Sequence, residues 1–533
     1  MAGTRKKVTE LSLEQVLWNC RVALRGVGST EKNRDAVISL VFLKFVGDKF
    51  TAQRDYLVNS YGDIAQFLEE PSFYNADNVF YLNETSRWDY IVSHASANDI
   101  AIVLDQAMAD IEDINPSLRG ALPLGIFSTL GASAASIKSL IDEVNKISED
   151  RFHEEDLIGR VYEYFLRAYA AAGNKEDGEF YTPASVVKLI AELIEPYSGT
   201  VYDPCCGTGG MFVQSLRFVE SHNGNRTNIS ILGQESKPET WRLCKMNLAV
   251  RGIAHNLGER NASTFTDDQH PDRKVDFIMA NPPFNLKKWR TENQLTSDPR
   301  WAGYEVIPPV SNANYAWILH MISKLDVTHG VAGFLLANGA LNSEEEYEIR
   351  KQIIEKDYVE AIIVLPRDMF YTTDTSATLW ILNMNKKAQV KDGRSLRDRS
   401  REILFMDLRR WNEHIDTIKI DQKSKKKKVV FSDEQIEKIK RIYHAWQAAD
   451  SDDYRDVPEL CKTAHIDGED GIKAHNYSLA PSKYIEFIDH DLEIDYKREM
   501  TRIQSEMKEL IQLEQESQTM LINAFKGIGY DID

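Results

Sequence analysis

Four consecutive residues, Asn281, Pro282, Pro283 and Phe284, have the types best suited to chemistry in this chain. They follow an apolar run, Phe277 to Ala280, which predicts a buried strand that ends at the asparagine. An exocyclic amino group on a base is a weak nucleophile, because its lone pair is delocalised into the ring. The Asn281 side-chain oxygen and the Pro282 carbonyl can each accept one of its N–H groups, which localises that lone pair toward an electrophile. Phe284 offers a ring on which a flipped base can stack. An ordinary turn that closes a buried strand explains the same four residues equally well.

A second segment upstream, Val201 to Phe212, favours the chemical interpretation. It has the pattern of a strand, a glycine turn and a helix, with Asp203 at the start of the turn. Glycines allow a ligand close to the backbone, and a helix N-terminus is favourable for an anion. The segment differs from the G-x-G-x-x-G fingerprint, and no G-x-x-x-x-G-K-[ST] motif occurs in the chain, which argues against nicotinamide and P-loop nucleotide sites. The next predicted strand, Ile231 to Glu235, ends in an acidic residue placed as an acceptor for ribose hydroxyls.

The order of five segments carries a resemblance to a known family. The chain resembles the modification (M, methylase) subunit of type I restriction-modification systems, an N6-adenine DNA methyltransferase that uses S-adenosyl-L-methionine. The matching segments are Leu43 to Phe45, Gly178 to Pro183, Asp203 to Phe212, Asn281 to Phe284, and Asn476 to Tyr484.

The resemblance implies roles for individual residues. The catalytic set is Asn281, Pro282 and Phe284, with no metal. The residues implied to hold S-adenosylmethionine are Glu179, Phe180, Tyr181, Thr182, Pro183, Ala184, Asp203, Gly207, Thr208, Gly209, Gly210 and Glu235. Near the cofactor adenine the chain departs from the family pattern, since Ser263 stands where an acidic or amide residue is frequent; Asp267 and Asp268 are the possible substitutes.

The composition of the chain indicates its cellular compartment. The chain has 533 residues, enough for two or three domains. Its 5 cysteines show no C-x-x-C spacing, so neither a disulfide framework nor a zinc site is expected, and the pair Cys205 and Cys206 is interpreted as buried, inert thiols. No signal peptide and no membrane-spanning apolar run is apparent. We therefore expect a cytoplasmic protein that does not associate with a membrane.

Net charge points to partners. With 82 Asp plus Glu against 64 Lys plus Arg, the chain carries −18, whereas a protein that grips duplex DNA unaided is usually basic. Part of the DNA grip and the reading of the site are therefore expected in another chain. The resemblance implies that this other chain is a specificity subunit. It would associate with two copies of a methylase subunit such as the present chain and with a separate restriction (motor and nuclease) subunit.

Apolar patterning divides the chain into three parts. Residues 1–172 show helical periodicity and predict a helical N-terminal domain. Residues 173–400 alternate short apolar runs with helical patterns and predict the S-adenosylmethionine-binding domain, an α/β fold with a Rossmann-like methyltransferase sheet. Residues 401–533 are charged, and an amphipathic pattern from Ile494 to Leu513 predicts a C-terminal helix for subunit docking, with packing inside this chain as the alternative.

Basic residues near the catalytic turn are the candidates for phosphate contacts. Lys287, Lys288 and Arg290 lie in a polar segment, residues 285–314, that follows the catalytic strand and is expected to line the base pocket or to be a solvated loop. The lysine tract Lys423 to Lys428 is interpreted as a solvated loop.

Other functions remain open at this level. The same turn in a protein methyltransferase acts on glutamine, although such enzymes usually have Tyr where this chain has Phe284. Methylation of cytosine N4 is a further alternative, favoured by Ser rather than Asn at position 281. A non-catalytic assembly subunit is the third, and the intact glycine loop and Glu235 argue against it.

Overall fold

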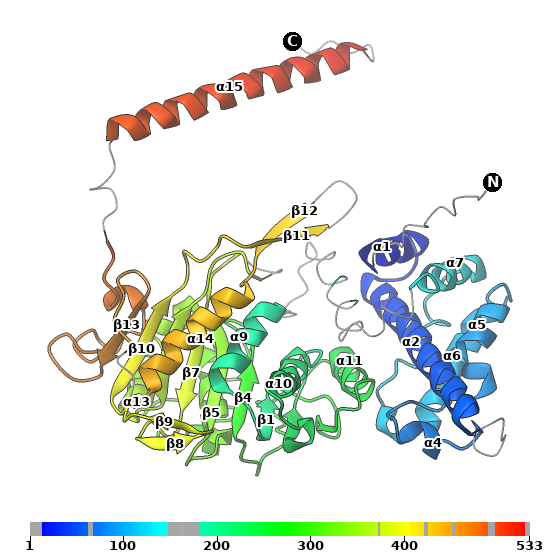
Figure 1. Cartoon of the computed structure of the whole chain (residues 1–533), viewed down its shortest axis with the longest axis horizontal. Helices are drawn as coiled ribbons and strands as arrows, with labels where there is room; N and C mark the ends of the chain where they lie inside the picture. Colours follow the sequence, from blue (N-terminus) through cyan, green and yellow to red (C-terminus); the bar gives the residue numbers. More distant parts are fainter. Residues whose placement is uncertain are drawn as a thin grey trace. The chain divides into compact units, whose positions relative to one another are not determined.

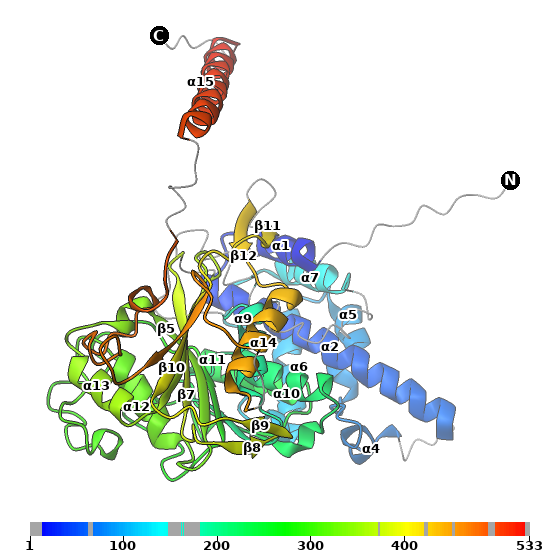
Figure 2. The same cartoon turned by 60° about the vertical axis from the view of Figure 1, so that its left-hand side comes forward.

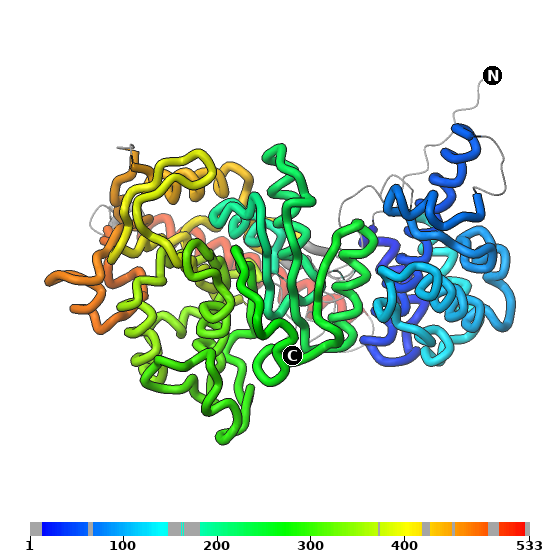
Figure 3. Tube along the Cα trace, turned by 90° about the horizontal axis from the view of Figure 1, so that it is seen from below, coloured from blue at the N-terminus to red at the C-terminus, as the bar shows by residue number. Residues whose placement is uncertain are grey.

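The computed structural model describes residues 13–61, 68–147, 161, 164, 182–370, 374–419, 425–449, 453–488 and 496–527. The chain divides into a unit of residues 1–485 and a second unit of residues 486–533. Figure 3 follows the larger unit from its helical bundle, in blue and cyan, into the sheet domain, in green to orange. No helix among the described residues has the length and apolarity needed to span a membrane.

The N-terminal bundle is entirely helical in its described part. Every residue of α2 from Ala36 to Gly47 is buried, and the apolar ones form one buried cluster with apolar residues of the neighbouring helices. Its helices are α1 (Leu13–Ala23), α2 (Thr30–Tyr61), α4 (Ser72–Asn75), η1 (Glu84–Ser86), α5 (Trp88–His94), α6 (Ile100–Ile114), η2 (Pro116–Leu118) and α7 (Ala134–Val144).

A nine-stranded sheet forms the second domain. Its order is β13-β10-β6-β7-β5-β4-β1-β2-β3, with β7 antiparallel to both neighbours and β13 antiparallel to β10. The strands are β1 (Gly199–Asp203), β2 (Ile229–Gly233), β3 (His255–Asn256), β4 (Phe277–Ala280), β5 (Val331–Ala337), β6 (Val359–Val364), β7 (Ala377–Asn383), β10 (Glu402–Asp407) and β13 (Cys461–His465). The predicted α/β sheet is confirmed, but the alternation of strand and helix patterns gave no sign that β7 and β13 run opposite to the other strands.

Helices cover both faces of the sheet (Figure 1; Figure 2). One apolar layer contains α9 (Ala184–Ile194), α10 (Gly210–Ser221), part of α11 (Pro238–Ala249) and α14 (Asp433–Gln447). The opposite layer contains α12 (Asn314–Lys324) and α13 (Tyr347–Glu355). Strands covered on both faces are apolar at nearly every position, which explains the nearly continuous apolar runs of β5, β6 and β7. Short 3-10 helices complete the domain: η4 (Arg226–Asn228), η5 (Pro299–Trp301), η6 (Asn338–Leu341) and η7 (Pro481–Lys483).

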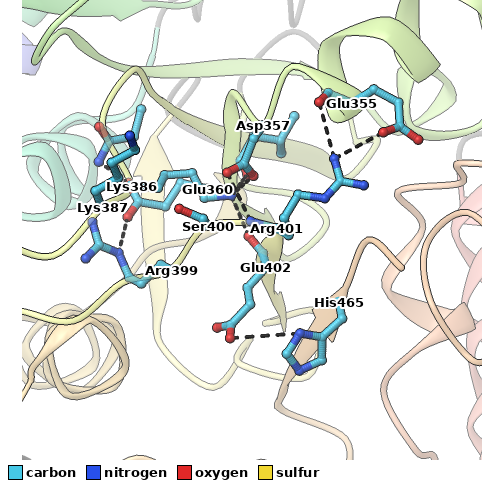
Figure 4. Close-up of polar contacts among 12 residues, drawn as sticks. Glu355, Asp357, Glu360, Lys386, Lys387, Arg399, Ser400, Arg401, Glu402 and His465 are labelled. Carbon is cyan, nitrogen blue, oxygen red and sulfur yellow. Dashed lines mark hydrogen bonds and ion pairs between the residues drawn. The ribbon is translucent and has the colours of Figure 1, made fainter. Parts of the chain in front are cut away.

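The sheet does not end at residue 400, where the sequence analysis placed the domain boundary. β10 pairs with β6, and β13 pairs with β10, so residues 402–465 return to the sheet. A buried ion network crosses the same position (Figure 4): Arg399 Nε donates to Glu360 Oε1 at 2.8 Å, and both side chains are fully buried. Lys386 Nζ donates to the Glu402 carbonyl at 2.7 Å. These charged residues around the predicted boundary therefore belong to the sheet domain.

Two small hairpins and one long helix complete the described chain. The hairpins pair β8 (Gln389–Lys391) with β9 (Arg394–Leu396), and β11 (Ile415–Lys419) with β12 (Lys425–Val429). The second unit contains α15 (Tyr496–Gly527), a helix that exposes a series of large apolar side chains: Met500, Ile503, Met507, Leu510, Ile511, Leu513, Met520, Leu521, Ile522 and Phe525. The predicted C-terminal helix is thus present.

Candidate active site

The three strands that precede the candidate motifs end side by side. β1 is parallel to β2 and to β4, with Asp203 opposite Gly233 and Tyr202 opposite Ile278. Parallel neighbours place their carboxyl ends at one edge of the sheet, which is where α/β proteins usually bind ligands. The glycine loop, Glu235 and the Asn281 turn therefore meet at this edge.

The glycine loop has a backbone that only glycine adopts easily. Gly207 has a φ of +53° and Gly209 a φ of +86°. A Cβ on Gly209 would lie 3.0 Å from Cys244 Sγ, whereas a Cβ on Gly207 or Gly210 would meet nothing within 4 Å. α11 thus packs against the loop at Gly209, whereas the space beside Gly207 and Gly210 is open. Asn247 of α11 fixes it further by donating from Nδ2 to the Thr208 carbonyl at 2.8 Å.

Two carboxyl groups border the glycine loop. Glu235 Oε2 accepts from the Gly207 amide at 3.1 Å, and Oε1 accepts from the Lys237 amide at 2.9 Å. Asp203 is almost fully buried, and its Oδ1 accepts from the Cys205 amide at 3.0 Å. Burial raises the pKa of Asp203 to about 7 and raises the pKa of Glu235 as well. A buried carboxyl and a half-buried one at the edge of this loop fit a ligand that brings positive charge and hydroxyl donors.

The side-chain amide of Asn281 has a hydrogen-bond partner for its nitrogen but none for its oxygen among the described residues. Its Nδ2 donates to Thr182 Oγ1 at 2.8 Å, which fixes the orientation of the side chain. Its Oδ1 is buried and has no hydrogen-bond partner among the described residues. A buried oxygen left without a donor costs about 1–3 kcal/mol, so a ligand N–H at this position would remove a penalty. This oxygen is the acceptor that the sequence analysis assigned to the target amine.

Aromatic side chains stand beside the turn. Phe284 is half-buried, and its ring contacts Phe370 edge-on with centroids 6.3 Å apart. Phe370 lies in the loop after β6 and was missed by the sequence analysis, because nothing in the sequence indicates that this loop returns to the Asn281 turn. The adjacent Pro282 is buried, which agrees with a rigid turn.

The segment before α9 is only partly described. Thr182, Pro183 and Ala184 lie at the start of α9, where the Pro183 carbonyl accepts from the Val186 amide at 2.9 Å. Glu179, Phe180 and Tyr181 lie outside the described residues. Thr182 contacts Asn281, the candidate catalytic residue, in addition to the role at the cofactor that the resemblance implies for it.

The candidates for the cofactor adenine separate into two groups. Asp267 Oδ2 accepts from Arg260 at 2.9 Å, and Asp268 Oδ2 pairs with Lys324 Nζ at 2.6 Å, so both carboxylates already have cationic partners. Ser263 follows Ala262, whose amide donates to the Glu235 carbonyl at 2.9 Å. Ser263 is thus next to the ribose-binding candidate, as its position in the sequence indicated.

The three candidate phosphate-contacting residues differ in their exposure. Lys287 and Lys288 are exposed. Arg290 is buried, and its guanidinium donates to the carbonyls of Thr291 and Glu292 at 3.0 Å and of Pro308 at 3.0 Å. Its position contradicts the expectation of a phosphate contact, because these carbonyls occupy donors that a phosphate would need. Arg290 instead holds the 285–314 segment together, a segment that is packed by buried Trp289 and Trp301 and is not a solvated loop.

Comparison with known proteins identifies the family. The profile of the N-6 DNA Methylase family matches residues 153–492, which is more than half of the chain, and the HsdM N-terminal domain matches residues 13–144. The chain belongs to the N-6 DNA methylase family. Within that family it is a type I restriction enzyme methylase subunit, and so an N6-adenine DNA methyltransferase.

Relatives and solved structures agree with this membership. The methylase subunit of type I restriction enzyme HindI from Haemophilus influenzae is 38% identical over 447 residues, which cover 81% of this chain and 93% of that protein. The MjaIX methylase subunit from Methanocaldococcus jannaschii is 30% identical over 535 residues, which cover 97% of this chain and 91% of that protein. A type I methyltransferase subunit from Streptococcus thermophilus has the same fold, with a TM-score of 0.70 at 22% identity, over 89% of this chain and 99% of that one.

Proposed function

We propose that this methylase subunit transfers a methyl group from S-adenosyl-L-methionine to N6 of an adenine flipped out of duplex DNA. The observation that supports this most directly is the Asn281 side chain, whose Nδ2 is held by Thr182 while its Oδ1 is buried without a partner. An amide oxygen in that condition at the end of β4 is ready to accept one N–H of a planar amine.

The chain's own residues position the adenine and polarise its amino group. Phe284 stacks on the base, Asn281 Oδ1 accepts one N6 hydrogen, and the Pro282 carbonyl accepts the other. When bound, the cofactor supplies a methyl group made electrophilic by its positively charged sulfur. The N6–methyl bond forms as the sulfur–methyl bond breaks, and N6 then loses a proton to solvent, so the chain needs no strong general base.

The cofactor is proposed to lie over the glycine loop. The open side of Gly207 and Gly210 gives it room, and Glu235 accepts from the ribose hydroxyls. Asp203 and the start of α9, Thr182 to Ala184, border the methionine half, together with Glu179 to Tyr181 and with Thr208 and Gly209. Ser263 is the candidate for the adenine end.

Partner subunits are proposed for the steps that this chain is not equipped to perform. The net charge of −18 favours a complex in which a specificity subunit reads the DNA site and a restriction subunit is separate. The exposed apolar residues of α15 are suited to pairing with helices of the specificity subunit, at two methylase copies per specificity subunit. This complex would work in the cytoplasm.

The proposal is tested with the chain co-expressed with the products of its neighbouring genes. Single-molecule sequencing of host DNA should show N6-methyladenine at one sequence motif, and its loss when Asn281 is replaced. Labelled methyl groups found on protein glutamine or on cytosine N4, with none on adenine, would reject the assignment. A purified complex that binds no S-adenosylmethionine in calorimetry would indicate an assembly subunit instead.

The raised pKa of Asp203 predicts a pH dependence of cofactor binding. The folded state holds a proton that the unfolded chain loses near pH 4, so this contribution to stability is present below about pH 4 and is lost as the pH rises through about 7. A cationic ligand favours the ionised carboxylate. Affinity for S-adenosylmethionine should therefore fall as the pH is lowered from 7.5 to 6, by up to about tenfold per pH unit once below the pKa.

Calorimetry across this pH range measures the dependence. Asp203→Asn is the matched variant, since it cannot titrate, and its affinity should be weaker but flat over the same range. An equally steep profile in Asp203→Asn would show that another group is responsible.

A further inference from the structure

The β11–β12 hairpin carries a concentration of positive charge in an acidic chain. Its two five-residue strands contain Lys419 and the run Lys425 to Lys428, against one acidic residue, Asp416. The antiparallel register places Lys427 opposite Thr417 and Lys428 opposite Asp416. Figures 1 and 2 show the hairpin, in yellow, projecting from the sheet domain.

One side of the hairpin's base is joined to the loop that contacts the catalytic turn. The Val429 amide donates to the Asp368 carbonyl at 3.1 Å, and Lys428 Nζ pairs with Asp374 Oδ1 at 2.8 Å. Both partners lie in the loop after β6, which also supplies Phe370, the ring that contacts Phe284. The hairpin is therefore connected to the base-stacking residue through a single loop.

The segment that follows β12 and opens α14 contacts the helix that begins beside Asn281. The Phe431 amide donates to Ser185 Oγ at 3.4 Å, and Lys188 Nζ donates to Asp433 Oδ1 at 2.8 Å. Ser185 and Lys188 lie in the first turns of α9, directly after Thr182, which holds the catalytic asparagine. The loop after β6 thus holds β12, and α9 holds the segment that continues from β12 into α14, at the edge where the target base would enter.

Lys428 and Lys427 of β12 differ in their exposure and in their contacts. Lys428 is buried against Asp374, and its side chain is 1% exposed. Lys427 precedes Lys428 on β12, where successive side chains point to opposite faces, and it is exposed. Lys287 and Lys288, in the segment that follows the Asn281 turn, are exposed as well. A base flipped into the site remains covalently bound to its backbone, so the phosphates that flank it must pass close to this edge. Exposed lysines there meet a dense row of negative charge.

We propose that the β11–β12 hairpin is a phosphate-contacting arm that grips the duplex backbone beside the flipped adenine. This inference rests on the proposed function, and it assigns to the methylase subunit itself a part of the DNA grip. It also revises the interpretation of the lysine tract as a solvated loop.

The test compares duplex binding by two charge-matched variants of the full chain in its co-purified complex. The first is Lys425→Gln/Lys426→Gln/Lys427→Gln, which keeps the Lys428 anchor. The second, Arg273→Gln/Lys274→Gln/Lys387→Gln, removes three exposed charges near the opposite, amino-terminal edge of the sheet. Fluorescence anisotropy with a duplex that contains the mapped site gives the affinity at several salt concentrations.

The hairpin variant should bind at least about tenfold more weakly near 0.1 M salt, and its log K against log [salt] slope should fall by about 0.9 for each lysine that contacts a phosphate. The control variant should behave as the wild type. The proposal would be overturned if the two variants had equal DNA affinities and equal salt slopes. It would also be overturned if the hairpin variant lost its partner subunits while the remaining chains bound DNA as before. Methylation by the wild-type complex is assayed in parallel. A complex that binds duplex DNA through the hairpin but methylates nothing would reject the proposed function and leave the hairpin proposal standing.

Discussion

Replacing Asn281 with Ala should abolish methyl transfer while cofactor binding stays near normal. In the proposed mechanism the Asn281 Oδ1 atom, which is buried without a partner among the described residues just after β4, accepts one N–H of the target amine and pulls it toward tetrahedral geometry. Loss of one such acceptor in an active site typically reduces the rate by about 10²–10³-fold. Single-turnover transfer of a labelled methyl group to duplex DNA measures the rate, and calorimetry measures the cofactor affinity.

Thr182→Val is the graded companion to this variant. It removes the oxygen that accepts from Asn281 Nδ2 at 2.8 Å but keeps the acceptor itself, so we expect a loss of about tenfold, with the side chain free to rotate. Near-normal turnover in Asn281→Ala would show that the amide oxygen is not the acceptor. A loss of cofactor binding equal to the loss of turnover would assign Asn281 to the cofactor instead.

Glu235→Ala should weaken S-adenosylmethionine binding by about 10–100-fold, because hydrogen bonds to a charged group contribute about 1.5–3 kcal/mol each. Two effects combine here. The ribose hydroxyls lose their acceptor, and the Gly207 amide, which donates to Glu235 Oε2 at 3.1 Å, loses the bond that fixes the glycine loop. Calorimetric titration of the complex measures the affinity.

Glu220→Ala is the matched control, since Glu220 is an exposed glutamate on α10, the helix that follows the glycine loop. It should leave the affinity unchanged. Glu235→Gln keeps one acceptor oxygen and should fall between the two. An affinity in Glu235→Ala equal to that of the control, with an unchanged melting temperature, would remove Glu235 from the cofactor site.

Most of the sheet and the identity of the motifs could be predicted from the sequence. The nearly continuous apolar runs predicted β4, β5, β6 and β7, because strands covered on both faces are apolar at nearly every position. The positive φ of Gly207 and Gly209 agrees with the predicted turn, since that backbone conformation restricts the residue type. Such features are local, so they leave a local pattern.

The sequence could not predict which segments return to one another. β10 and β13 join the sheet from beyond the expected boundary, and Arg290 turns inward to backbone carbonyls that its own type and position do not indicate. A long-range contact depends on chain reversals between its partners, and single-sequence patterns do not record them.

The sequence by itself determined that this chain has an Asn-Pro-Pro-Phe turn after a buried strand, a glycine loop and a carboxylate at the next strand end, and therefore the chemistry of methylating a planar amine. Only the tertiary structure decided how that chemistry is supported. It holds Asn281 Nδ2 with Thr182, 99 positions away, and it sets Phe370 against Phe284. It also fixes the β11–β12 hairpin to the loop after β6, and the segment after β12 to α9. The physical reason is that residue type fixes what an atom can donate or accept, whereas the parallel order of the strands fixes which atoms share an edge.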